Sequence, residues 1–388
     1  MPLRARPHAG PATLPALATI VALAAALILV AGSGPAFASP ISCGDTITTD
    51  TTLEADLIDC PSNGVVIGAD DITLDLNGHV IDGDGTEFAD CGKREFCDVG
   101  ILDIDHDGVT LRDGSTRGFS YGVFVGSAHG SRLLSISARR NIFFGVVIGR
   151  SSRALVRNCS LSNNVPPQGD GLGLFAADHI RVRRNSIRRN AGPGIHVAAG
   201  SSDGLIKGNV LSRNGPSLLI EASRISVRDN DVIGGAGIIV DPPGNRNSII
   251  GNRVSRATDS ISVEKGRGNL IARNVVIGAR GNGIRLGLDR PAIGGAGNVV
   301  RGNLVRGSRE DGFRVDAEDG HSLLRRNIAV AAGDDGFDVE SPTAKLTGNR
   351  AVRNADLGIE AVNGVVDGGA NRAAHNGARR QCKNIACH

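Results

Sequence analysis

The sequence predicts an all-β protein, a single right-handed parallel β-helix solenoid of about 12 coils with an N-terminal cap. Its composition is the first of three observations behind this prediction. The 388 residues include 54 Gly, ten Phe, one Tyr and no Trp. Many turns and a core of small and β-branched side chains suit short strands better than packed helices. The other two observations are periodic patterns that run in phase.

The first periodic pattern is a four-residue motif of a small residue, an apolar residue, any residue and an apolar residue. Ten steps of this motif cover 236 residues, or 23.6 residues per coil. The alternation predicts a short strand in each coil with one face turned inward. The motif starts at Gly122, Gly145, Gly171, Gly194, Ser217, Gly237, Ser260, Gly283, Gly312, Gly336 and Gly358.

The second periodic pattern is an asparagine that recurs once per coil. Stacked at one turn, asparagine side chains can bond from coil to coil and satisfy polar groups that would otherwise be buried without partners. We therefore predict a structural ladder, and we expect no glycosylation at the sequon Asn158-Cys159-Ser160 because its asparagine belongs to that ladder. The asparagines are Asn158, Asn185, Asn209, Asn230, Asn252, Asn274, Asn303, Asn327 and Asn349.

The N-terminus has the features of a secretory signal peptide over residues 1–38. Arg4 and Arg6 precede an apolar stretch from Leu17 to Val30, and Ala36-Phe37-Ala38 fits a cleavage site. The apolar stretch is too short to span a bilayer, so we expect a secreted or periplasmic protein without stable membrane insertion. The remaining chain is predicted to divide into a cap at 39–70, the β-helix at 71–368 and a disulfide-tied tail at 369–388.

Charge and cysteine content narrow the possible partners. Without the signal peptide the chain keeps 41 basic and 40 acidic residues, so we expect no nucleic-acid partner. We expect a monomer. Cysteine spacing in an exported protein suggests local disulfides, with Cys159 left over as a small thiol in the wall. The predicted pairs are Cys43 with Cys60, Cys91 with Cys97, and Cys382 with Cys387.

One segment carries a resemblance to a known family. Ile72-Thr-Leu-Asp-Leu-Asn-Gly-His-Val-Ile-Asp82, which follows Cys43-Gly-Asp and Cys60-Pro, resembles the N-terminal coil of bacterial secreted proteins in the pectate-lyase-like superfamily. That superfamily consists of right-handed β-helix proteins and includes the NosD-type group. The resemblance implies the fold but no single reaction, because the superfamily contains lyases, hydrolases, epimerases and adhesins.

Two successive coils near the C-terminus carry a cluster of carboxylates. Residues 309–316 and 333–340 align with a step of 24, which places Asp311 beside Asp335 and Arg314 beside Asp338. The pattern resembles the calcium-binding aspartates of family-nine pectate lyases. This resemblance implies Ca²⁺ as the cofactor, bound by Asp311, Asp334, Asp335 and Asp338. The alternative is a solvated or salt-bridged turn in which Arg314 neutralises Asp338.

The base that such a lyase needs is not evident. Only Lys345 and Lys383 follow the cluster, and neither is expected on a suitable coil. Arg350 and Arg353 are weak catalytic candidates, because arginine rarely gives up its proton. For substrate binding, His196, Arg285 and Arg314 share one outward position of the motif and could contact an acidic polysaccharide; the alternative is solvated surface residues.

Two other metal or catalytic sites have less support. Asp105-His106-Asp107 resembles a motif of alginate C5-epimerases, in which His and Tyr are the acid and base; Tyr121 lies in the next coil. An exposed acidic turn is the alternative. Nine histidines without a His-x-His or Met-rich tract do not indicate a copper site.

Two functions therefore remain open. The first is an enzyme that cleaves or epimerises an acidic polysaccharide with help from calcium, and the scarcity of aromatic residues argues against stacking platforms for neutral sugars. The second is a non-catalytic envelope or surface protein with a binding or structural role, which the missing base favours.

Overall fold

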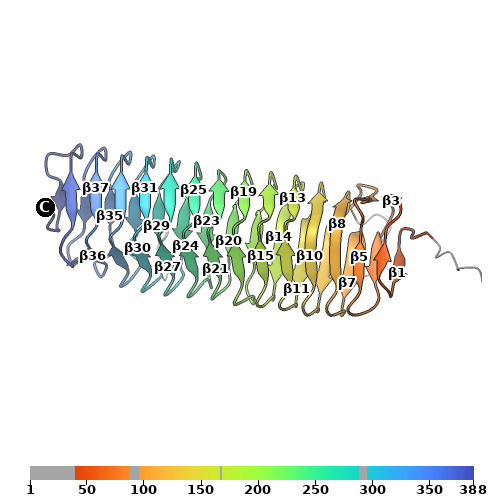
Figure 1. Cartoon of the computed structure of the whole chain (residues 1–388). Coiled ribbons are helices and arrows are strands. Elements are labelled where there is room, and N and C mark those ends of the chain that lie inside the picture. Colours follow the sequence, from red (N-terminus) through yellow and green to blue (C-terminus); the bar gives the residue numbers. More distant parts are fainter. Residues whose placement is uncertain (1–39, 88–95, 167, 288–294) are drawn as a thin grey trace, which may run out of the picture. The chain divides into compact units, whose positions relative to one another are not determined.

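The computed structural model describes residues 40–87, 96–166, 168–287 and 295–388 (Figure 1). The chain divides into two compact units, Met1–Pro40 and Ile41–His388. The predicted signal peptide lies outside the described residues and stays a prediction. The described residues form strands only, and among them no helix is long and apolar enough to cross a membrane. The all-β prediction is confirmed.

One continuous parallel sheet of 15 strands runs through the second unit. We call it the long sheet. Each of its strands pairs in register with the strand one turn before and one turn after it (Figure 1). Its strands are β1 (Asp45–Ile47), β4 (Val65–Ile67), β7 (Val99–Ile104), β9 (Tyr121–Gly126), β11 (Phe144–Gly149), β14 (Asp170–Phe175), β17 (Ile195–Val197), β20 (Leu218–Ile220), β23 (Ile238–Val240), β26 (Ile261–Val263), β29 (Ile284–Leu286), β32 (Phe313–Val315), β35 (Phe337–Val339), β38 (Ile359–Ala361) and β41 (Cys382–Lys383).

The other strands form two further parallel lines, which share the long strands β8 (Thr110–Arg117) and β10 (Arg132–Arg139). The first line also contains β2 (Thr51–Thr52), β5 (Thr73–Asp75), β12 (Leu155–Arg157), β15 (Arg181–Arg183), β18 (Leu205–Lys207), β21 (Ser226–Arg228), β24 (Ser248–Ile250), β27 (Leu270–Ala272), β30 (Val299–Arg301), β33 (Leu323–Arg325), β36 (Lys345–Thr347) and β39 (Val366–Asp367). The second contains β3 (Leu57–Cys60), β6 (Val80–Gly83), β13 (Ser160–Ser162), β16 (Ser186–Arg188), β19 (Val210–Ser212), β22 (Asp231–Ile233), β25 (Arg253–Ser255), β28 (Val275–Ile277), β31 (Leu304–Arg306), β34 (Ile328–Val330), β37 (Arg350–Val352) and β40 (Arg372–Ala374).

The solenoid has about 14 turns, slightly more than the predicted 12. Both ends contribute to the difference. The segment predicted as a cap contains β1, β2 and β3, which pair with β4, β5 and β6 of the next turn. In the predicted tail, β40 and β41 pair with β37 and β38. The repeat motif did not reveal these terminal turns, because it is recognisable only from Gly122 to Gly358.

The core is the inside of the stack, filled by the second and fourth residues of each motif together with the inward residues of the other two lines of strands. Inward side chains such as Val123, Ile148 and Ile220 have no exposed surface. Phe313 and Phe337 stack with ring centroids 4.6 Å apart and an interplanar angle of 5°. Side chains in equivalent positions of successive turns thus pack on one another, and the inward and outward sets follow the predicted alternation.

Asparagine ladders run along the turns, as predicted for most of the chain. From Asn185 to Asn371, each side-chain amide donates to the oxygen of the next at 2.9 to 3.2 Å. The prediction is wrong for Asn158, which is exposed and has a φ of 57°. Its neighbour Cys159 takes the ladder position instead, since its N–H donates to Asn185. Asn158 is therefore an exposed sequon asparagine outside the ladder.

Disulfides tie both ends of the solenoid. Cys43–Cys60 and Cys382–Cys387 are formed, as predicted. Cys97 is disulfide-bonded, and its predicted partner Cys91 lies outside the described residues. Cys159 is a free, buried thiol whose pKa burial raises to about 11, which makes it unreactive. These disulfides fit an extracellular or periplasmic protein.

Candidate functional site

Each turn of the long sheet presents three positions beside its outer face. The first precedes the small residue of the motif, the second is the motif's third residue, and the third follows its last residue. In the turn of β32 these are Asp311, Arg314 and Asp316. Because the strands pair in register, equivalent positions of successive turns form three rows along the sheet. The chemistry of these rows changes from one end of the face to the other.

At the C-terminal end, Arg314 is the centre of a charged network. Its Nη1 lies 2.6 Å from Asp338 and 3.4 Å from Asp311. Its Nε lies 2.8 Å from Asp316, and its Nη2 lies 3.0 Å from Glu340. The predicted pairing of Arg314 with Asp338 is confirmed by the register of β32 and β35. One guanidinium therefore contacts four carboxylates on two turns.

Arg285 extends this network by one turn towards the N-terminus. Its Nη2 lies 2.8 Å from Asp316, and its Nη1 lies 3.8 Å from Asp259. The Asp316 side chain is 3% exposed and lies between the two guanidiniums. Arg285 and Arg314, predicted to bind a polyanion, thus have their charges in ion pairs within the protein.

The carboxylates of the network outnumber its guanidiniums, and burial makes their ionisation harder. Burial, together with neighbouring carboxylates, raises the pKa of Asp311 to about 6, of Asp338 to about 7 and of Asp335 to about 8. Two backbone contacts oppose these shifts. The N–H of Asp335 donates to Asp311 at 3.0 Å, and the N–H of Leu357 donates to Asp335 at 2.7 Å.

Three of the four predicted calcium ligands meet at one point. Asp311, Asp334 and Asp335 each offer an oxygen within 4.8 Å of the others. Asp311 and Asp335 are buried and Asp334 is exposed. Such a set of hard oxygen atoms fits a calcium ion in its ligand type. Asp338, the fourth predicted ligand, is outside that group and is held by Arg314.

The structure does not bring the predicted arginine bases to this cluster. Arg350 begins β37, which is in the second of the other two lines, and Arg353 follows the end of that strand. Lys383, which sequence reasoning assigned to the tail, instead lies on β41 in register with Glu360. Its Nζ is 2.5 Å from Glu360, and this contact raises the pKa of Lys383, so the lysine stays protonated.

His196, the third predicted substrate contact, lies in the second row of β17 near the middle of the face. Its Nε2 is 3.0 Å from Glu221 and its Nδ1 is 3.6 Å from Asp170. Although burial opposes it, these two carboxylates raise the pKa of His196. The imidazole is thus paired within the protein, like Arg285 and Arg314.

The acidic turn near Asp105 does not assemble the predicted epimerase pair. Tyr121 pairs with Val99 at the start of β7, whereas Asp105 follows the end of that strand. Six residues of extended chain separate the two ends by roughly 20 Å. Alternation along residues 103–107 predicts one shared face for Asp103, Asp105 and Asp107. This prediction is wrong for Asp103, which points inward in register with Val125 and is fully buried, whereas Asp105 is exposed. Neither side-chain oxygen of Asp103 has a hydrogen-bond partner, and His106 Nδ1 is 3.6 Å away.

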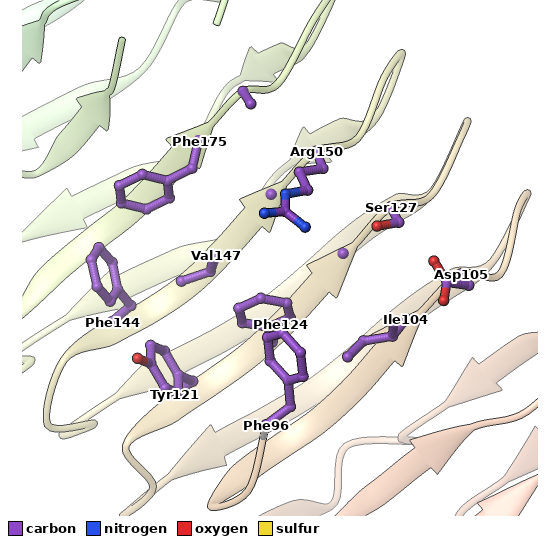
Figure 2. A pocket seen from close by; sticks show the side chains of 13 residues that line it. Phe96, Ile104, Asp105, Tyr121, Phe124, Ser127, Phe144, Val147, Arg150 and Phe175 are labelled. Atoms are coloured by element: carbon purple, nitrogen blue, oxygen red, sulfur yellow. The ribbon is translucent and has the colours of Figure 1, made fainter. Parts of the chain in front are cut away.

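At the N-terminal end of the same face, aromatic side chains line a groove of about 840 Å³ (Figure 2). Tyr121 and Phe144 stack at 5.9 Å with an interplanar angle of 11°. Phe124 contacts Tyr121 edge-on at 5.9 Å, and Phe175 contacts Phe144 edge-on at 5.6 Å. Phe96 lies 4.9 Å from Phe124 and is 45% exposed. Several of the few aromatic residues of the chain are thus gathered at one end of this face.

The total number of aromatic residues in the sequence did not reveal this groove. The relevant signal was position: Tyr121, Phe124, Phe144 and Phe175 all fall on outward positions of three successive motifs. The register that located the charged network would have located the aromatic groove as well.

Comparisons with known proteins support the fold. A model described as "Right handed beta helix region" matches residues 77–241. Among solved structures, the A-module of the mannuronan C-5 epimerase AlgE6 from Azotobacter vinelandii matches with a TM-score of 0.50 and 13% identity, covering 79% of this chain and 88% of the module. This likeness shows the fold alone. No curated protein sequence matches the chain.

Two further structures are similar at lower scores. A DFA-IIIase from Arthrobacter chlorophenolicus A6, without its lid and in complex with GF2, has a TM-score of 0.47 and 16% identity, with 70% of each chain covered. The pectate lyase Pel9A has a TM-score of 0.43 and 13% identity, with 74% of this chain and 71% of the lyase covered.

The chain is a parallel β-helix protein, as the resemblance of its first coil predicted, and the right-handed family model matches part of it. A second model, described as "Periplasmic copper-binding protein (NosD)", matches residues 217–368. The matched segment contains one histidine, His321, and neither cysteine nor methionine. Its residues therefore do not fit a copper ion, which binds to nitrogen and sulfur ligands.

Proposed function

We propose that the protein is an exported β-helix protein that binds an acidic polysaccharide along the long sheet, with calcium held by Asp311, Asp334 and Asp335. The observation that carries this proposal is the meeting of these three carboxylates within 4.8 Å. Calcium bound there would neutralise carboxylates of the protein and of the polymer. Cleavage or epimerisation of the bound polymer is the enzymatic form of this proposal.

The charge of the face supports a role for the cation. Around Arg314 the carboxylates exceed the guanidiniums, and no arginine of the network has an uncommitted charge to offer a polyanion. An acidic polymer would meet net repulsion there unless a cation lay between the two. Calcium dependence is therefore a requirement of the proposal.

The non-catalytic alternative rests on the protonation of the side chains that could act as catalytic bases. Among the described residues, the cations next to the acidic cluster are Arg314 and Lys383, and carboxylates raise the pKa of both. Neither side chain is suited to remove a proton from a sugar. This observation favours a binding protein over a lyase.

The experiment compares wild type with Asp335→Asn and with the control Asp229→Asn, which removes an exposed carboxylate outside the network. Calcium should raise the unfolding temperature of wild type and of the control, and should not do so for Asp335→Asn. Retention on polygalacturonate or alginate should follow the same pattern, and unsaturated or epimerised products would establish catalysis. If calcium changes neither stability nor retention, the proposal is wrong.

A further inference from the structure

The aromatic groove lies at the other end of the face from the calcium group. From β14 to β32, the nearer strand of the calcium group, the long sheet advances six strands, which is roughly 29 Å. The groove is lined by rings from β9, β11 and β14 together with Phe96, and β7 contributes Ile104 (Figure 2). Its ligand can therefore be argued from its own residues, independently of the proposed function.

Two sides of the groove differ in chemistry. The rings form one side, and Asp105, Ser127 and Arg150 form the other (Figure 2). These three polar residues directly follow successive strands, and all have positive φ, between 48° and 63°. The same turn geometry thus repeats and places a polar side chain at the same edge each time. The polar edge has one acid and one base, so it adds no net charge.

Glycines keep the space between these two sides open. Gly126 and Gly149 occupy the third row, where Phe175 stands one turn later. A Cβ added at Gly149 would meet no atom nearer than 4.0 Å. The backbone does not require glycine there, and any larger side chain would project into the groove.

We infer that this groove binds a neutral glycan, with the apolar faces of its sugar rings on the aromatic side chains and its hydroxyls on the polar edge. A lipid would leave the charges of Asp105 and Arg150 without polar partners, which is unfavourable. A polyuronate would find only one cation, beside an acid. From β7 to β14 the groove spans three strand steps, roughly 14 Å, which suits a short run of sugar rings in a linear chain.

The chain contains a built-in reporter for this inference. Tyr121 is the only tyrosine and there is no tryptophan, so intrinsic fluorescence comes from the groove itself. We would titrate the mature protein with cellohexaose, mannohexaose, xylohexaose and, as the acidic comparison, hexagalacturonate. At least one neutral hexaose should give a saturable change, in the presence of a calcium chelator and equally in Asp335→Asn.

Two variants test the location. Phe124→Ala removes one stacking ring and should weaken binding about three- to ten-fold. Gly149→Leu retains every ring but fills the groove, and it should weaken binding more than Phe124→Ala does. Both variants should keep a cooperative unfolding transition, which excludes loss of the fold as the cause.

Three outcomes would overturn the inference. The first is the absence of any response to the neutral hexaoses up to millimolar concentration. The second is an unchanged response in Gly149→Leu, which would place the ligand elsewhere. The third is a response to phosphatidylcholine vesicles but to no hexaose, which would make the groove a lipid site. None of these results affects the calcium experiment, so the two proposals can fail separately.

Discussion

The aromatic groove and the charged network are built on the same three rows of one sheet. In the second row, Phe124 and Val147 line the groove, whereas Arg314 and Asp338 in equivalent positions form the network. The backbone is the same at both ends, because each turn pairs in register with the next. The difference shows that the fold supplies a regular set of outward positions, and the side chains placed there decide what the surface can contact.

The aromatic groove and the charged network also differ in the interactions that stabilise them. Apolar contact between rings holds the groove, and this contact is insensitive to pH and salt. The network depends on two guanidiniums that compensate a larger number of partly buried carboxylates. Removing a side chain from the network should therefore change stability far more than opening or closing the groove.

Among single substitutions measured at neutral pH, the largest expected effect is that of Arg314→Ala. Without this guanidinium, Asp311 and Asp338 are left partly buried without a paired cation, and Asp316 keeps only Arg285. Removal of one partner from a buried ion pair typically costs 3–5 kcal/mol, and because Arg314 is 22% exposed we expect about 3 kcal/mol. Urea unfolding at neutral pH measures this change.

Arg314→Lys is the matched control, since it keeps the charge but loses the planar contact to several carboxylates. It should lose less than Arg314→Ala. If Arg314→Ala is as stable as wild type, the network is a solvated surface and the contrast with the groove disappears.

The second expected effect concerns Asp103, which is buried beneath the groove end without the compensation found in the network. Burial and the charges of Asp107, Asp70 and Asp105 raise its pKa from 3.8 to about 7. The folded state therefore holds this proton more tightly than the unfolded chain does. Its contribution to the free energy of unfolding falls as pH rises from about 4 to about 7, by up to about 4 kcal/mol.

The substitution Asp103→Val should remove this pH-dependent decrease in the free energy of unfolding. Val125 and Ile148 occupy the equivalent inward positions of the next two turns, so valine suits the site. We expect the variant to exceed wild type by about 2–3 kcal/mol at pH 8 and by much less at pH 4. Urea unfolding across this pH range is the measurement. Asp338→Asn is the comparison within the network. If the stability of Asp103→Val depends on pH in the same way as that of wild type, Asp103 has a partner in solution.

These residues show how much of the fold and of the candidate site could be predicted from the sequence. Alternation and a constant coil length are local properties, so they placed Arg314 beside Asp338 and Phe337 in the core. The number of contacts that one guanidinium makes is a matter of side-chain geometry, and register alone could not show that Arg314 reaches four carboxylates. The inward orientation of Asp103 was missed because the four-residue motif is recognisable only from Gly122 onward, so it did not set the phase of this earlier strand. Lys383 was misplaced because the terminal turns lack the motif.

The smallest expected effect compares two glycines of the long sheet. At Gly336, beside the network, an added Cβ would lie 2.5 Å from Asn354 and 2.6 Å from the oxygen of Gly358, so Gly336→Ala should destabilise by about 1–3 kcal/mol. Gly149→Ala meets no such contact, and its φ is not positive. It should stabilise the protein by about 0.5 kcal/mol, because alanine restricts the unfolded chain. If both substitutions destabilise the protein equally, the backbone requires glycine at position 149. If only Gly336→Ala destabilises, glycine at position 149 reduces stability slightly while leaving room beside the rings. A ligand-binding groove requires that room, and a purely structural turn does not.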